Sequence, residues 1–307
     1  MVSRIILLFT LGLMASMTLP ATATPHSQVK PREFNSDNIT PASSSILVLN
    51  TTGASILSAI VDSGAGYAYF GTSATPAQVF KVRLSDFTNV ANLTLGGSAN
   101  AALAASAAIL DPIHEIAYFG TLNGQIVKVD LSTFTNVTVV HPGLGGITAA
   151  TIDPAAGFGY FGTSTGNILK MRLSDLTLNR TLTPTPSNTT IILPPSHSID
   201  SAVIDTASGY AYFGDSGCSL NIFCTPSPNV VVKVRLSGFS IVSELDAAED
   251  SLTSAGIDTS GGYIYFGGAN LAGSQIVRFS LTDLSKKQVE QVHEGRRELH
   301  LTFQSWG

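Results

Sequence analysis

Five times along the chain, a short aliphatic run that ends in Asp is followed by a small turn and an aromatic run that ends in Tyr-Phe-Gly. The phenylalanine lies eight residues after the Asp in every copy, and the copies begin at Ala59, Ala108, Ala150, Ala202 and Ala255. β-Branched and aromatic residues favour strands, and turn residues such as those at 153–157 (Asp-Pro-Ala-Ala-Gly) favour a tight reversal. Each copy therefore predicts two antiparallel strands.

A second repeated block follows each aromatic run after a loop of variable length. It starts with a cation, at Lys81, Lys128, Lys170, Lys233 and Arg278. In the second unit, residues 125–131 alternate so that Ile126, Lys128 and Asp130 share one face of a predicted strand. A short turn then leads to a fourth apolar run over residues 136–140. Each unit is therefore predicted to hold four strands.

Four-stranded units that recur every 42 to 53 residues are typical of β-propeller blades. We therefore predict an all-β fold, a propeller of four-stranded antiparallel blades with five recognisable repeats. Residues 101–108 are rich in alanine and have helix propensity, but the repeat places a strand from about Ala105 onward. The alternative is a parallel β-helix, whose coils are usually shorter, and the hairpin-type turns favour antiparallel strands instead.

The ends of the propeller are less regular than its body. Ser45–Asn50 reads as one N-terminal strand, which we expect to close the last blade because a ring hides its sheet edges. The propeller is assigned to residues 45–290, preceded by a flexible segment at 24–44 and followed by an irregular tail at 291–307. The ring has either five blades plus these extras, or is a shortened copy of a six- or seven-bladed protein.

The stretches Ile-Asp-x-x-x-Gly-x-x-Tyr-Phe-Gly and Gly-x-Ile-x-Lys-Val-x-Leu-Ser resemble the repeats of secreted YVTN/YncE-like β-propellers, within the broad WD40-like superfamily. The resemblance covers about residues 45–290. The Gly-His and Trp-Asp dipeptides of true WD40 blades are absent, since the chain's one tryptophan is Trp306.

Residues 1–23 read as a secretory signal peptide. Arg4 supplies the positive charge, an apolar run covers 5–15, and Ala21-Thr-Ala23 is a small-residue cleavage site. The alternative is a membrane anchor, but a spanning helix needs about 20 apolar residues, and no other stretch reaches that length. We therefore expect the protein to be secreted, with no membrane span.

Two further features agree with export. Six sequons for N-linked glycosylation occur, at Asn38, Asn50, Asn92, Asn136, Asn179 and Asn188. The only two cysteines, Cys218 and Cys224, are expected to form a disulfide in an oxidising compartment. Metal binding is the alternative for this pair, but no His or second Cys pair lies near it in the sequence.

Composition excludes two classes of protein. Charged residues make up 12% of the chain and hydrophobic residues 44%, which is incompatible with a disordered chain. The formal net charge of −5 and the absence of basic clusters argue against binding of nucleic acid.

The repeated polar positions are the first candidates for chemistry. Five aspartates recur before the turns, at Asp62, Asp111, Asp153, Asp205 and Asp258. They are expected to cap their own turns; the alternative is a carboxylate ring at a channel mouth, although catalysis usually needs non-equivalent groups. The cation that opens each second block is expected to sit in water or beside a carboxylate rather than to form a ring for an anionic ligand.

Motifs for nucleophilic, metal or phosphate chemistry are absent from the sequence, and the six histidines (26, 114, 141, 197, 293, 300) are scattered. The enlarged loop 215–229 of the fourth unit is either a partner contact or a tolerated insertion. We therefore predict a secreted or cell-surface glycoprotein that acts as a non-catalytic scaffold for a protein or glycan, with no catalytic, cofactor or metal residue. The alternatives are a lactonase-like propeller hydrolase with a metal at the central channel, and a structural protein whose repeats assemble.

Overall fold

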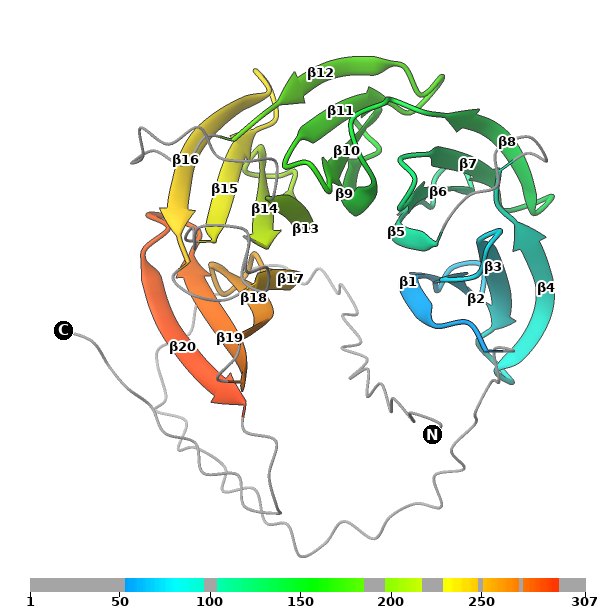
Figure 1. Ribbon diagram of the computed structural model, residues 1–307, viewed down its shortest axis with the longest axis horizontal. Coiled ribbons are helices and arrows are strands. Elements are labelled where there is room, and N and C mark those ends of the chain that lie inside the picture. The colour runs from blue at the N-terminus through cyan, green and yellow to red at the C-terminus, as the bar shows by residue number, and fades with distance from the viewer. Residues whose placement is uncertain are drawn as a thin grey trace, which may run out of the picture. The chain divides into compact units, whose positions relative to one another are not determined.

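The computed structural model describes residues 53–96, 104–184, 197–216, 229–247, 251–270 and 273–292. These residues form five antiparallel sheets of four strands each, and no helix occurs among them. The sheets follow one another as the blades of a five-bladed propeller (Figure 1). The predicted all-β fold and its five repeats are therefore confirmed. In the part of the chain so described, no helix has the length and apolar character to cross a membrane.

Within each blade, strands that are consecutive in sequence pair with one another. Blade 1 holds β1 (Ile56–Asp62), β2 (Tyr67–Thr72), β3 (Gln78–Arg83) and β4 (Thr88–Thr94). Blade 2 holds β5 (Ala105–Asp111), β6 (Ile116–Thr121), β7 (Ile126–Asp130) and β8 (Thr135–Val140). Blade 3 holds β9 (Ile147–Asp153), β10 (Phe158–Thr163), β11 (Ile168–Arg172) and β12 (Leu178–Leu182). Blade 4 holds β13 (Ser198–Asp205), β14 (Tyr210–Ser216), β15 (Val230–Arg235) and β16 (Ser240–Asp246). Blade 5 holds β17 (Ser251–Asp258), β18 (Tyr263–Asn270), β19 (Gly273–Ser280) and β20 (Lys286–Val292).

The register repeats from blade to blade. The aliphatic run pairs with the aromatic run, so that Ala59 lies opposite Phe70 in blade 1 and Ala108 lies opposite Phe119 in blade 2. Every innermost strand has one irregularity near its start, as between Ala105 and Ala107. The strand expected from about Ala105 does begin at that residue, because pairing with β6 overrides the helix propensity of the alanines.

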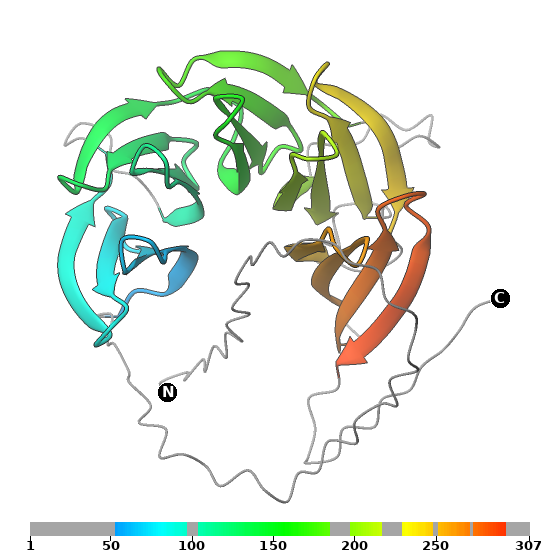
Figure 2. The same cartoon turned by 180° about the vertical axis from the view of Figure 1, so that it is seen from behind.

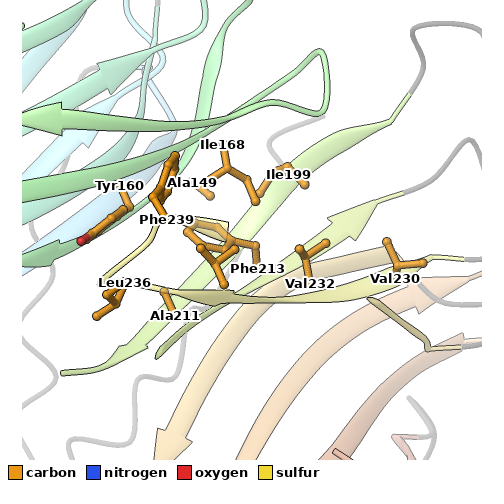
Figure 3. Close-up of a cluster of buried hydrophobic side chains, with 11 residues drawn as sticks. Ala149, Tyr160, Ile168, Ile199, Ala211, Phe213, Val230, Val232, Leu236 and Phe239 are labelled. Carbon is orange, nitrogen blue, oxygen red and sulfur yellow. The ribbon is translucent and has the colours of Figure 1, made fainter. Parts of the chain in front are cut away.

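The hydrophobic core lies between successive blades. Each innermost strand packs against the next innermost strand, from β1 through β5, β9 and β13 to β17. Figure 3 shows the core between blades 3 and 4, where Tyr160 and Ile168 of one blade meet Ile199 and Phe213 of the next. The phenylalanines of the Tyr-Phe-Gly triplets in blades 2 to 5 are 0% exposed: Phe119, Phe161, Phe213 and Phe266. Burial of such rings is a principal source of stability.

The last blade is complete without an N-terminal strand. Its fourth strand is β20, which extends to Val292 and so passes the boundary expected at residue 290. Ser45–Asn50, expected to supply a closing strand, lies outside the described residues, as do residues 1–23 and 24–44. Blades 1 and 5 do not pack against each other as successive blades do, and both views show them apart (Figures 1 and 2).

Candidate interaction face

The innermost strands begin side by side because a repeated hydrogen bond joins their starts. Side-chain hydroxyl groups donate to the backbone carbonyl oxygen at the start of the next innermost strand. The pairs are Ser58 with Ala105 (2.8 Å), Ser106 with Ile147 (2.5 Å), Thr148 with Ile199 (2.7 Å) and Ser201 with Leu252 (2.7 Å). The propeller therefore has two distinct ends. We call the end with these strand starts and the second-to-third-strand loops the loop end, and the opposite end the turn end.

The turn end is regular. The repeated aspartates accept backbone N–H groups of their own turns, from Ala65 to Asp62 (2.9 Å), His114 to Asp111 (3.2 Å), Ala156 to Asp153 (3.0 Å), Ser208 to Asp205 (3.1 Å) and Gly261 to Asp258 (2.8 Å). Each carboxylate thus serves its own turn. Within the described ranges, no three His, Cys, Asp or Glu side chains come together in a way that would hold a metal ion.

A second set of aspartates caps the turns between third and fourth strands. Asp86, Asp130 and Asp175 each accept the backbone N–H two residues later, from Thr88, Ser132 and Thr177. Hydrogen bonds hold the pKa of each carboxyl below its ordinary value: chiefly the Thr88 hydroxyl for Asp86, the Ser132 hydroxyl for Asp130 and the Thr177 N–H for Asp175. These carboxylates therefore stay charged, and each is hydrogen-bonded within its own turn.

The repeated lysines link blades, whereas they were expected to sit in water or beside a carboxylate. Each ammonium group donates to a backbone carbonyl of the next blade, from Lys81 to Leu131 (3.2 Å), Lys128 to Leu173 (3.0 Å), Lys170 to Leu236 (3.3 Å) and Lys233 to Leu281 (3.4 Å). Most also lie over an aromatic ring of their own blade, as Lys170 does 4.1 Å from the centroid of Phe158. Burial lowers the pKa of Lys170. The repeated cation is thus a structural cross-link, and no ring of free cations results.

Blade 4 departs from the repeat at the loop end. In blades 1 to 3, a threonine ends the aromatic strand and its hydroxyl accepts a backbone N–H, from Gln78 to Thr72 (3.1 Å), Gln125 to Thr121 (3.0 Å) and Asn167 to Thr163 (3.0 Å). Asp215 replaces this threonine in blade 4. Its Oδ2 atom lies 2.5 Å from Nδ1 of His197, and the Asp215 residue is only 2% exposed.

A second carboxylate extends this group. Asp200 accepts hydrogen bonds from the hydroxyl groups of Ser198 and Ser216, one on each of its oxygens. The remaining oxygen of Asp215, Oδ1, is buried without a hydrogen-bond partner among the described atoms. We call His197, Ser198, Asp200, Asp215 and Ser216 the blade-4 polar cluster.

The protonation of this cluster is set by burial and by charge. Burial raises the pKa of Asp215, and the neighbouring Asp200 charge acts in the same direction. The hydrogen bond to Asp215 raises the pKa of His197 above its ordinary 6.5. The pair therefore holds protons more tightly than free side chains do.

The cluster pairs a buried carboxyl group with an imidazole. It does not form a complete nucleophilic site, which would also need a hydroxyl or thiol on the imidazole. An Asp that binds His Nδ1 is the arrangement that orients a general base. However, within the described residues the His197 ring has this one hydrogen bond, and no hydroxyl or thiol bonds its other nitrogen. No residue of the cluster stands out in the sequence. His197, Asp200 and Asp215 depart from the repeat at separate positions, and nothing in the sequence alone joins them. Of the enlarged loop that was singled out, residues 217–228, with Cys218 and Cys224, lie outside the described residues.

Sequence comparisons give no relative: no family model matches, and no curated protein matches either. Solved structures match the fold. The structure of U3-55K aligns with a TM-score of 0.61 and 8% identity over 80% of this chain and 67% of the other. Hydrazine synthase from Kuenenia stuttgartiensis aligns with a TM-score of 0.62 and 10% identity, over 81% of this chain and 68% of the other. The RRP9 WD40 repeats align with a TM-score of 0.59 and 8% identity, over 80% of this chain and 66% of the other. At such identity, the comparison supports the β-propeller fold and nothing finer.

Proposed function

We propose that the protein is an exported glycoprotein, of the YVTN/YncE-like kind, whose propeller serves as a non-catalytic scaffold that binds a partner at the loop end of blade 4. The observation that carries this proposal is the blade-4 polar cluster. Blades 1 to 3 share a threonine whose hydroxyl accepts a backbone N–H at this position, whereas blade 4 has the buried pair of Asp215 and His197 there. A departure from an otherwise uniform repeat is where specificity is expected to reside.

The surroundings of the cluster fit a contact surface. The segments 185–196 and 217–228 adjoin it in sequence, directly before His197 and after Ser216, and both are longer than their counterparts in the other blades. Inserted loops on a rigid scaffold are common binding elements. The engagement of the repeated aspartates in their own turns favours binding over the alternative of a lactonase-like metal site.

Export and glycosylation are supported by the placement of the sequons. Asn92 and Asn179 are exposed on β4 and β12, the outermost strands of their blades. A glycan on an outer strand blocks pairing between sheet edges of different molecules. Asn136 differs, because its Nδ2 donates to the carbonyl of Thr94 at 2.9 Å. We therefore expect glycans on Asn92 and Asn179, and little or none on Asn136.

Export is tested by expression of the full chain in a eukaryotic secretory host. We expect the protein in the medium, with an N-terminus at Thr24 and glycopeptides that contain Asn92 and Asn179. Retention of an uncleaved, unglycosylated chain inside the cell would contradict the proposal.

Binding is tested with arrays of defined glycans and displayed extracellular proteins. Asp215→Thr restores the residue of blades 1 to 3 and is therefore expected to fold, and Asp258→Asn at the turn end is the matched control. The proposed site predicts that a bound ligand is weakened about tenfold or more by Asp215→Thr and not by Asp258→Asn. If every ligand is held equally by both variants, or none is bound, the assignment to blade 4 is wrong.

A further inference from the structure

The two outer faces of the five-blade array carry the same groups as the faces that are buried inside it. We call the side of blade 1 that faces no other described blade the leading face, with Ile56, Val61, Phe70, Leu84 and Phe87. The side of blade 5 that faces no other described blade is the trailing face, with Ser254, Tyr263, Tyr265, Ile276 and Arg278. These residues are equivalent, by register, to residues that join blades elsewhere.

The leading face is apolar and partly exposed: Ala68, Phe80 and Val82 on it are buried, whereas Leu84 is 41% exposed. Three of the four equivalents of Leu84 at the internal contacts, Leu131, Leu173 and Leu236, are 4%, 5% and 7% exposed, and the fourth, Leu281, is partly buried. Ile56 is 37% exposed, and its equivalents at the starts of the other innermost strands are at most 1% exposed. Phe87 keeps a left-handed backbone, with φ of 55°, as its equivalent Phe134 does with φ of 53°. Phe134 packs on Tyr69 of the blade before it. Blade 1 therefore retains the strained turn that positions such a ring, although no described blade packs against Phe87.

The trailing face has the complementary groups. Ile276 is 41% exposed, and its four equivalents, Val79, Ile126, Ile168 and Val231, are 0% exposed. Tyr265 is partly exposed, in contrast to the fully buried Tyr69, Tyr118, Tyr160 and Tyr212. Arg278 lies over Tyr263, 4.4 Å from the ring centroid, as Lys81 lies over Tyr67.

The polar groups of the two faces also match. Inside the array, a hydroxyl and a lysine of one blade donate to two carbonyl groups of the next blade. The trailing face has the equivalent groups in Ser254, whose hydroxyl donates to the Gly267 carbonyl of its own blade at 3.3 Å, and in Arg278, whose Nε atom is buried without a hydrogen-bond partner among the described atoms. The leading face offers the equivalent acceptors, the carbonyl groups of Ile56 and Leu84. An unpaired buried guanidinium nitrogen is costly, and a carbonyl from another blade would satisfy it.

We propose that the trailing face of one molecule binds the leading face of a second copy, so that the protein associates head to tail. The contact would continue the interface that already joins blades four times within the chain. A second copy is the partner that fits because this chain itself carries both halves of the contact. The solved propellers that match are longer, since the chain covers 67% and 68% of two of them.

Such a contact uses different surfaces on the two molecules and is therefore heterologous. This property gives a specific test, which is independent of the partner proposed for blade 4. Leu84→Lys alters the leading face alone and Ile276→Lys alters the trailing face alone. Both side chains are 41% exposed, so both variants should fold; Val139→Lys, at a 40% exposed position on the outer strand β8, is the matched control.

Sedimentation velocity of the full chain, over about a hundredfold range of concentration, measures the association. We expect the wild-type protein and Val139→Lys to associate, and each end-face variant to associate about tenfold or more weakly. An equimolar mixture of Leu84→Lys and Ile276→Lys should form dimers and nothing larger, because each variant retains the face that the other needs. Wild-type protein that stays monomeric throughout, or variants that do not complement each other, would overturn the proposal.

Discussion

Gly120 and Ile147 approach each other so closely that a β-carbon on the glycine would lie 2.3 Å from Cγ2 of Ile147. The glycine ends a Tyr-Phe-Gly triplet in blade 2, and the isoleucine begins the innermost strand of blade 3. The same approach recurs between Gly162 and Ile199, at 2.5 Å. The third residue of the triplet is therefore a glycine because the next blade occupies the place of its side chain.

This closeness predicts a large difference between two identical substitutions. Gly120→Ala should lower the free energy of unfolding by about 1–3 kcal/mol, because the methyl group overpacks the contact with Ile147. Gly267→Ala should cost little, since a β-carbon there meets only the side chain of Ser254 within its own blade. Urea unfolding of both variants measures the difference, and equal losses would contradict it.

Glu115 predicts a stabilising substitution. It has a left-handed backbone, with φ of 54°, at the position where the other four blades have a glycine. Glu115→Gly should raise the free energy of unfolding by up to about 1 kcal/mol, because the β-carbon disfavours this conformation. Glu115→Ala keeps that β-carbon and serves as the control. A thermal melt in which both variants behave alike would show that strain is not the cause.

The lysine cross-links predict a loss of stability when the charge is removed. Lys170→Met keeps an aliphatic stem but loses the bond to the Leu236 carbonyl and the position over the Phe158 ring. We expect the free energy of unfolding to fall by about 1–2 kcal/mol. Arg278→Met, at the equivalent position of blade 5, should cost less in dilute solution, where no further blade meets it. Chemical denaturation of both variants provides the comparison.

Four buried tyrosines predict a late titration. Burial raises the pKa of Tyr69, Tyr118, Tyr160 and Tyr212 to about 12, from an ordinary value of 10.0. The phenolate absorbance of these four side chains should therefore appear only near that pH. Since the folded state holds these protons more tightly, stability is intact below pH 10 and is lost as the pH rises toward 12. Absorbance titration of the native protein, with the unfolded protein as control, checks this.

The blade-4 polar cluster predicts a dependence of stability on pH near neutrality. The pKa of His197 is raised in the folded state, so its contribution is complete below its ordinary pKa of 6.5 and is lost as the pH rises through the folded value. We expect the melting temperature to fall as the pH rises above about 6.5, and His197→Gln to flatten this fall. A fall that is equally steep in His197→Gln would contradict the prediction.

The sequence was sufficient to predict the strands of each blade, but not the side-chain contacts between blades. The spacing of Asp and Tyr-Phe-Gly predicted the strands because local turn chemistry and alternation depend on neighbouring residues. The role of Lys81 was missed because its acceptor, the Leu131 carbonyl, lies fifty residues away in another blade. The cluster of His197 and Asp215 was missed for a related reason: these side chains meet only after β13 pairs with β14.

The uniform carbonyl acceptors at the starts of the innermost strands have a consequence for how such a protein changes in length. Each of blades 2 to 5 contacts the blade before it through a main-chain oxygen atom, which does not depend on the identity of the side chain. If a gene segment that encodes one blade were duplicated or deleted, the blades on either side would therefore still present the same carbonyl acceptors. Growth or loss by whole units requires no compensating substitutions, and the number of blades can drift while the architecture of each joint persists.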